Sequence, residues 1–485
     1  MTPITRRPLR SLAIGLAGLM AGLMLLAVAV ALFWPEDHLR ERVTRQASEQ
    51  LGMTVAVTGD VSLRFWPVPA IRATGVTIGS ESDDHPVGEL EAISLSVGWL
   101  PLLRGELVPE TLVLDSPILR LSPGAVDSLV GEQPDDERRG GEFAPLDLRI
   151  HDGEIHWRAG RDDPGISITG LELELTDFDR QPVADEAPPW ARTSLQLTAS
   201  AEALHIHALE LSDIDLEMAG KDGVFRSDDL EMTFLGSRGT GNARLDLSAA
   251  TPSATLDIDF DSLDLANLPE AWVPTNSFVG NADLTASLET RGQEPGRWLR
   301  HLDGEIRLSG RDLQLRGVDL DEELARYRRT QRFSLVDAAA VVFLGPAALL
   351  ASKGSDFARL LGEGDVAETR IVHLVSDWRF DAGTAQTRDV ALSTTRNRLA
   401  TQASLDLPSR RINHTTVAVV DRRGCAVMEQ EVHGSLDAPV IEEPHVVEAL
   451  LGAPLGLLQR GVDAISRGGE DCEVFYAGSV AAPSD

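Results

Sequence analysis

Apolar and polar residues alternate along most of the chain after about residue 50, and this two-residue period is typical of β-strands with one apolar face and one polar face. Long amphipathic helices that could cover so many apolar faces are few. A second sheet, the same sheet curled over, or a bound apolar ligand must therefore cover them. The expected lining of this apolar surface is Ile93, Leu95, Val97, Leu146, Leu148, Ile150, Leu171, Leu173, Leu175, Leu256, Ile258 and Phe260.

The only long uncharged stretch is Ser11–Trp34, which is long enough to cross a bilayer as a helix. Three arginines precede it and two acidic residues follow it, so the positive-inside rule predicts a cytoplasmic tail at residues 1–10. We therefore expect a single-pass protein of a bacterial inner membrane with its main body in the periplasm. Cleavage as a signal peptide is the alternative, because small residues at alternate positions occur near Ala29.

The segment after the anchor predicts an amphipathic helix over residues 35–52, with apolar residues four apart and Gly52 at its end. Val55–Val57 and Val61–Phe65 follow as two short strand patterns around Gly59-Asp60. A Gly-Asp pair between two strand patterns predicts a β-hairpin.

Three later segments depart from the strand period. Asp321–Gln331 predicts a short charged helix, and Asp337–Leu361 predicts a helical hairpin packed on one end of the sheet, with membrane or partner contact as the alternative. Val446–Ile465 also has helical character, and we expect it to close the distal end or to engage another protein.

Cys425 and Cys472 are the only cysteines. An exported compartment allows them to pair, so we expect a disulfide. A zinc site is the weaker reading, because neither cysteine belongs to a C-x-x-C motif.

The charge balance limits the choice of partners. The chain carries 76 Asp and Glu against 44 Lys and Arg, a formal charge of -32, which excludes nucleic acid as a partner and disfavours anionic headgroups at the main body. Asp257, Asp259 and Asp261 resemble the start of a calcium loop, but the turn glycine and the final glutamate are missing. His205 and His207 lack a third ligand nearby in sequence. The sequence has no P-loop, G-x-S-x-G or HExxH motif, so we expect no enzyme, no metal and no cofactor.

Several motifs follow one another in a characteristic order along the chain: Gly52–Val55, Val57–Asp60, a strand ending near Pro67, Ile71–Ile78, a C-terminal hairpin at His301–Leu308 and Leu313–Leu320, and the tail motifs Asn397–Ala400, Val419–Asp421, Gly424–Ala426, His433–Ser435 and Cys472–Val480. In this ordered set the chain resembles the AsmA family of inner-membrane-anchored envelope proteins. The resemblance implies an elongated, curled antiparallel sheet with an apolar inner groove, and a part in phospholipid traffic to the outer membrane.

The expected architecture is therefore mainly β: an N-terminal transmembrane helix followed by an elongated, curled antiparallel β-sheet that forms an apolar groove, with short capping helices. We expect an N-terminal and central β-groove over 53–300 and a C-terminal AsmA-like β-groove over 301–445, with a helical insertion at about 321–361. A C-terminal helix and a disulfide-tethered tail are expected over 446–485. The expected function is to hold or passively conduct phospholipid for outer-membrane lipid homeostasis, with an envelope protein as a further partner at the distal end. A structural or chaperone-like factor for outer-membrane protein assembly is the alternative, and periodicity alone equally allows a sealed β-sandwich.

Overall fold

The computed structural model describes a mainly β protein. The described residues are 54–79, 86–104, 108–122, 147–158, 165–181, 188, 190–206, 209–269, 278–292, 298–330, 367–436, 438–443, 445–446 and 472–483. The expected anchor, the helix over 35–52, the hairpin Asp337–Leu361, nearly all of Val446–Ile465, Leu146 and His207 lie outside them. Among the described helices, none has the length and apolar character to cross a membrane.

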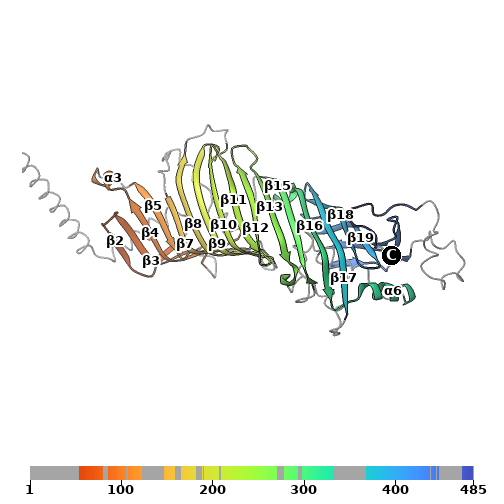
Figure 1. The fold of residues 1–485 in the computed structure, drawn as a ribbon. Coiled ribbons are helices and arrows are strands. Elements are labelled where there is room, and N and C mark those ends of the chain that lie inside the picture. The colour runs from red at the N-terminus through yellow and green to blue at the C-terminus, as the bar shows by residue number, and fades with distance from the viewer. Residues whose placement is uncertain are drawn as a thin grey trace, which may run out of the picture. The chain divides into compact units, whose positions relative to one another are not determined.

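The chain divides into two compact units at Arg180 and Gln181. Unit 1 contains one sheet, with neighbours in the order β1 and β2, β3, β4, β5 and β6, β7, β8 (Figure 1). Its elements are β1 (Thr54–Val57), β2 (Val61–Arg64), β3 (Ala70–Gly79), β4 (Gly88–Val97), α3 (Trp99–Leu103), β5 (Pro109–Asp115), β6 (Ile118–Leu121), β7 (Asp147–Trp157) and β8 (Ile166–Arg180).

Two pairings in unit 1 depart from the expected antiparallel sheet. β5 and β6 both run parallel to β7, whereas the other described pairs are antiparallel. Parallel neighbours need a long connection that returns the chain to the same end of the sheet, and residues 122–146 provide that length.

The hairpin predicted around Gly59-Asp60 is wrong. β1 and β2 both pair with β3, from Thr54 opposite Gly79 to Arg64 opposite Ala70, so they are two halves of one edge strand. The residues between them form an irregularity against Thr74, whose hydroxyl accepts a hydrogen bond from the Asp60 amide at 2.9 Å. A Cβ on Gly59 would lie 2.3 Å from the same hydroxyl oxygen. Gly59 is needed because the backbone there approaches β3 closely. In the sequence, a glycine required for close approach cannot be distinguished from a glycine in a turn.

Unit 2 is a succession of antiparallel neighbours that follows chain order from β9 to β21, with β22 and β23 both on β21 and the short β14 on β16. Its elements are β9 (Thr193–Ile206), β10 (Leu209–Lys221), β11 (Val224–Phe234), β12 (Ser237–Asp246), β13 (Ser253–Asp264), η1 (Leu265–Asn267), β14 (Phe278–Val279), β15 (Asn281–Arg291), η2 (Leu299–His301), β16 (Asp303–Arg316), α6 (Leu320–Thr330), β17 (Glu368–Asp381), β18 (Thr384–Ser393), β19 (Arg398–Asp406), β20 (Arg411–Val420), β21 (Ala426–Ser435), β22 (Ala438–Ile441) and β23 (His445–Val446). The charged helix predicted over Asp321–Gln331 is confirmed, since α6 spans Leu320–Thr330.

Bulges interrupt several of these long strands. Asp213, Ser262 and Asp312 have positive φ values of 48°, 58° and 51° within β10, β13 and β16. The family-like hairpin at His301–Leu308 and Leu313–Leu320 is therefore wrong: most of it is the single strand β16 with a bulge at Asp312. A short polar side chain tolerates the left-handed backbone conformation, so the strand bends there and does not reverse.

The C-terminal segment 472–483 packs on β17–β20. Its Tyr476 and Val480 lie against a row of small side chains, Val375, Ala391, Ala400 and Ala418, which occupy aligned positions on four neighbouring strands. The predicted disulfide between Cys425 and Cys472 is present, with a Cα–Cα distance of 6.0 Å. Small side chains leave room for a covering segment, and the disulfide holds the start of that segment beside β21.

Candidate functional site

The apolar residues predicted in unit 1 form aligned rows across neighbouring strands. Leu95 lies opposite Leu112, and the row continues through Leu148 to Leu175. A parallel row joins Ile93, Leu114, Ile150 and Leu173 in the same registers. Residues directly opposite each other share a face of the sheet, so these side chains form one apolar surface.

Sequence reasoning missed β5, which supplies Leu112 and Leu114 to these rows. Its sequence, Thr-Leu-Val-Leu-Asp, contains three consecutive apolar residues and therefore hides the two-residue period.

Unit 2 repeats this arrangement over β13, β15 and β16. Leu256, Ile258 and Phe260 lie opposite Leu288, Ala286 and Leu284. The face continues to Ile306 and Leu308 on the next strand. Phe260 also meets Phe234 edge to face, with ring centroids 5.8 Å apart. One continuous apolar cluster results, and it extends over β10–β21.

Burial is uneven among the predicted lining residues. Ile150, Leu171, Ile258 and Phe260 are buried. The half-buried members are Ile93, Leu95, Val97, Leu148, Leu173, Leu175 and Leu256. The half-buried group retains surface that a guest molecule can contact, whereas the buried group is already packed by protein. Their role as lining stays a prediction.

The same contrast divides the apolar cluster of unit 2. On β10, Leu211, Ile214 and Leu216 remain half-buried. Toward the C-terminus the face closes, and the fully buried side chains there include Leu313, Leu315, Ile371, Leu374, Trp378 and Leu392. Leu320 and Leu324 of α6 join this closed part. The start of α6 therefore packs into the closed part of the apolar cluster.

A hydrogen-bond network around Asp321 holds the start of α6 in place. The buried carboxylate of Asp321 accepts hydrogen bonds from Thr394 at 2.5 Å, Thr395 at 3.1 Å and the Asn397 amide at 2.6 Å. A charged acceptor with three donors is well compensated for its burial. The helix is thereby tied to the turn between β18 and β19.

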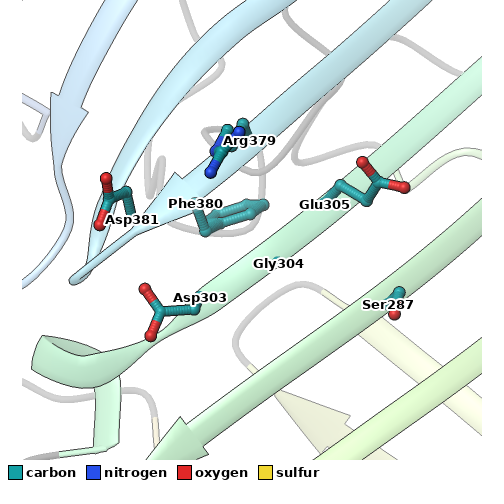
Figure 2. A pocket seen from close by; sticks show the side chains of 7 residues that line it. All are labelled: Ser287, Asp303, Gly304, Glu305, Arg379, Phe380 and Asp381. Atoms are coloured by element: carbon teal, nitrogen blue, oxygen red, sulfur yellow. The ribbon is translucent and has the colours of Figure 1, made fainter.

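The polar face of unit 2 has a small open hollow near the ends of β15, β16 and β17, of about 450 Å³ (Figure 2). Its lining is Ser287, Asp303, Gly304, Glu305, Arg379, Phe380 and Asp381. Figure 2 shows the carboxylates of Asp303 and Asp381 at one end and Ser287 with Glu305 at the other. Arg388 pairs with Glu305, and the Ala382 amide donates to Asp303 at 2.8 Å. These charges already have partners, and the mixed lining does not suit an acyl chain.

Potential catalytic or metal groups are dispersed over the surface. Asp257 and Asp259 alternate along β13 on its polar face, where Asp257 accepts a hydrogen bond from Ser287. His205 lies 3.6 Å from Glu210 in an exposed pair. A hydrogen bond from His151 lowers the pKa of Glu172, which is another surface contact. Over the described residues, no three His, Cys, Asp or Glu side chains converge as a metal site would require.

Comparison with known proteins identifies a family. The sequence model of the AsmA family matches residues 9–124 and 171–350. No curated protein matches the chain. The tail motifs from residue 397 onward, which also resemble this family, lie outside the matched ranges. Because the match covers more than half of the 485 residues and agrees with the large β-sheet, this chain belongs to the AsmA family.

Proposed function

We propose that this AsmA-family protein holds or passively conducts phospholipid along its apolar face and so supports outer-membrane lipid homeostasis. In this proposal the stretch Ser11–Trp34 anchors it in a bacterial inner membrane, with the N-terminus in the cytoplasm and both β units in the periplasm. An envelope protein would receive or deliver lipid at the distal end. Family membership and the β-rich fold support this role.

The observation that carries the proposal is the half-buried aliphatic face, exemplified by Leu173 in unit 1 and Leu256 in unit 2. Aliphatic side chains that are aligned across strands offer acyl chains a smooth surface, and each CH₂ group that leaves water gains about 0.8 kcal/mol. No specific polar contact is needed along the way. A headgroup can remain at the margin of the sheet, where charged residues begin.

Transfer along such a face would be passive. The sequence has no nucleotide-binding motif, so a gradient or a partner would set the direction. We also propose that the protein is not an enzyme, because the AsmA family is not known for enzymatic activity.

Photocrosslinking tests the proposal directly. A photoreactive amino acid at Leu256 or Leu173 should attach phospholipid in cells, whereas one at Thr285, exposed on the polar face of β15, should not. Phospholipid should also copurify with the full chain. Equal labelling at Leu256 and Thr285, or none at either, would favour the alternative of a structural or chaperone-like assembly factor that carries no lipid.

Charge substitution gives a second test. Leu173→Asp and Leu256→Asp should reduce copurified phospholipid while the β content is retained, because both side chains are only half-buried. Thr285→Asp is the matched control. Ile258→Asp would not be informative, because Ile258 is buried in the core and a charge there would unfold the sheet whatever its role.

A further inference from the structure

Four large apolar side chains are exposed on two connections of unit 1, the β2–β3 loop and the β4–β5 loop that contains α3. Trp66 and Val68, between β2 and β3, are 78% and 39% exposed, and Trp99 and Leu100, in α3, are 40% and 71% exposed. We call these four residues the aromatic patch. Scattered exposed apolar residues need no explanation, but a group with two tryptophans that lies outside the core is typical of a contact surface.

The two loops are tied together, so the patch is a built surface. The indole Nε1 of Trp99 donates to the carbonyl oxygen of Pro67 at 2.9 Å. The amide of Val97 donates to the carbonyl oxygen of Pro69, also at 2.9 Å. These bonds hold α3 beside the β2–β3 loop and present both indoles from one end of the sheet.

The core of unit 1 does not need these side chains. Its buried cluster consists of Val55, Val61, Ala73, Val76 and Leu90, and the aromatic patch contributes nothing to it. Folding therefore does not account for Trp66 or Leu100 at these positions. Exposure of these apolar side chains to water costs free energy, and contact with an apolar partner would recover it.

The chemistry of the patch fits a membrane interface. Tryptophan is enriched at the headgroup level of bilayers, where its ring is buried and its N–H remains near polar groups. Arg64 and Arg104, both exposed, flank the two loops and supply positive charge next to the patch in a chain with a net charge of -32. Phosphate groups of a bilayer surface complement such a local pair of cations.

The position of the patch in the chain also favours the membrane as its partner. Only residues 35–53 separate Trp34, the end of the proposed anchor, from Thr54 at the start of β1. β1 and β2 then continue as one edge strand of about 35 Å, which ends next to Trp66. In the proposed function, unit 1 is therefore the unit that follows the anchor most closely along the chain.

We propose that Trp66, Val68, Trp99 and Leu100 insert into the interfacial layer of the phospholipid bilayer that carries the anchor. This inference rests on the membrane anchoring in the proposed function. It adds a second attachment point at the opposite end of the first strand. Two attachment points lay the β1–β2 edge along the bilayer surface and restrict the orientation of unit 1.

Tryptophan quenching in the full chain tests this arrangement. The protein is reconstituted into vesicles of phosphatidylethanolamine and phosphatidylglycerol, with and without phosphatidylcholine brominated near the top of its acyl chains. Trp66→Phe removes one reporter with little effect on folding, and Trp190→Phe, in unit 2 and 43% exposed, is the matched control. We expect bromolipid to quench the emission that Trp66→Phe removes and to leave the emission that Trp190→Phe removes unchanged.

The outcomes separate the two proposals. If Trp66 emission is as insensitive to bromolipid as Trp190 emission, the patch does not contact the bilayer and the inference is overturned, with a protein partner as the reading that replaces it. If no emission is quenched, that of Trp34 included, the anchor fails together with the patch. Leu100→Asp provides a second variant: it should lift the loops and decrease the quenching of Trp66. Lipid carriage is measured separately by crosslinking at Leu256.

Discussion

The phenolic hydroxyl of Tyr476 donates a 2.5 Å hydrogen bond to Oδ1 of Asp389, across 87 residues of sequence. The same hydroxyl accepts the amide of Val480 at 3.0 Å, and the amide of Ser479 donates to the other Asp389 oxygen at 2.8 Å. Arg398 completes the contact, with its guanidinium 5.2 Å from the centre of the tyrosine ring and a hydrogen bond to the carbonyl oxygen of Val480. This network fixes the C-terminal segment on β17–β20.

Tyr476→Phe should release the C-terminal segment. The substitution removes the donor to Asp389 and the acceptor for Val480, and hydrogen bonds to a charged group typically contribute about 1.5–3 kcal/mol. Backbone amides of residues 475–480 should then exchange hydrogen faster by mass spectrometry. Tyr327→Phe makes the same chemical change in α6 and should leave exchange in this segment unchanged. Unaltered protection in Tyr476→Phe would show that apolar packing alone holds the segment.

Acid should detach the same segment. Burial opposes the charged form of Asp389, but hydrogen bonds from Ser479 and Tyr476 outweigh it and lower the pKa of Asp389 below its ordinary value. A lowered pKa in the folded state means that this stabilisation is present above the ordinary value and is lost as the pH falls through the folded-state pKa. Burial raises the pKa of Asp377, which lies directly opposite on β17 and gives an effect of opposite sign.

Hydrogen exchange in residues 475–480 should therefore show protection at neutral pH and loss of protection when the pH falls below about 4. Asp389→Asn should weaken the protection at neutral pH and flatten its dependence on pH. An unchanged acid transition in Asp389→Asn would assign it to another carboxylate.

Reduction of the Cys425–Cys472 disulfide should also loosen the segment. The bond joins residues 47 apart, for which the loop-entropy relation gives about 4 kcal/mol of stabilisation. Cys425→Ser with Cys472→Ser should lower the midpoint of urea unfolding and expose the tail to trypsin. Reducing agent should reproduce this result in the wild-type protein and have no effect on the double variant. Equal unfolding midpoints before and after reduction would contradict a stabilising role.

Asp321→Asn should detach α6. An amide retains only one acceptor oxygen, so either the exposed Thr395 or the pair Thr394 and Asn397 loses its acceptor. The bonds that remain no longer go to a charged group, and the helix loses about 1 kcal/mol or more of stabilisation. Hydrogen exchange of the backbone amides should increase over residues 320–330, because Leu320 and Leu324 would no longer be held in the buried apolar cluster. Glu322→Gln, exposed on the same helix, is the control. Similar exchange in both variants would show that Leu320 and Leu324 hold the helix without Asp321.

The pattern of residues by itself determined the β architecture, the apolar face of the strands that alternate regularly, the short helix at α6 and the pairing of Cys425 with Cys472. These follow from local rules, since alternation fixes a face and two cysteines leave one partner each. Only tertiary structure decided that β1 and β2 form one edge strand, that β5 and β6 run parallel to β7, and that β16 continues through Asp312. Gly59-Asp60 and Asp312 are residues that suit a turn or a strand irregularity equally well, and the choice depends on the neighbouring strand. The division of the apolar face into half-buried and closed parts likewise depended on tertiary structure, because periodicity gives the direction of a side chain but not what packs against it.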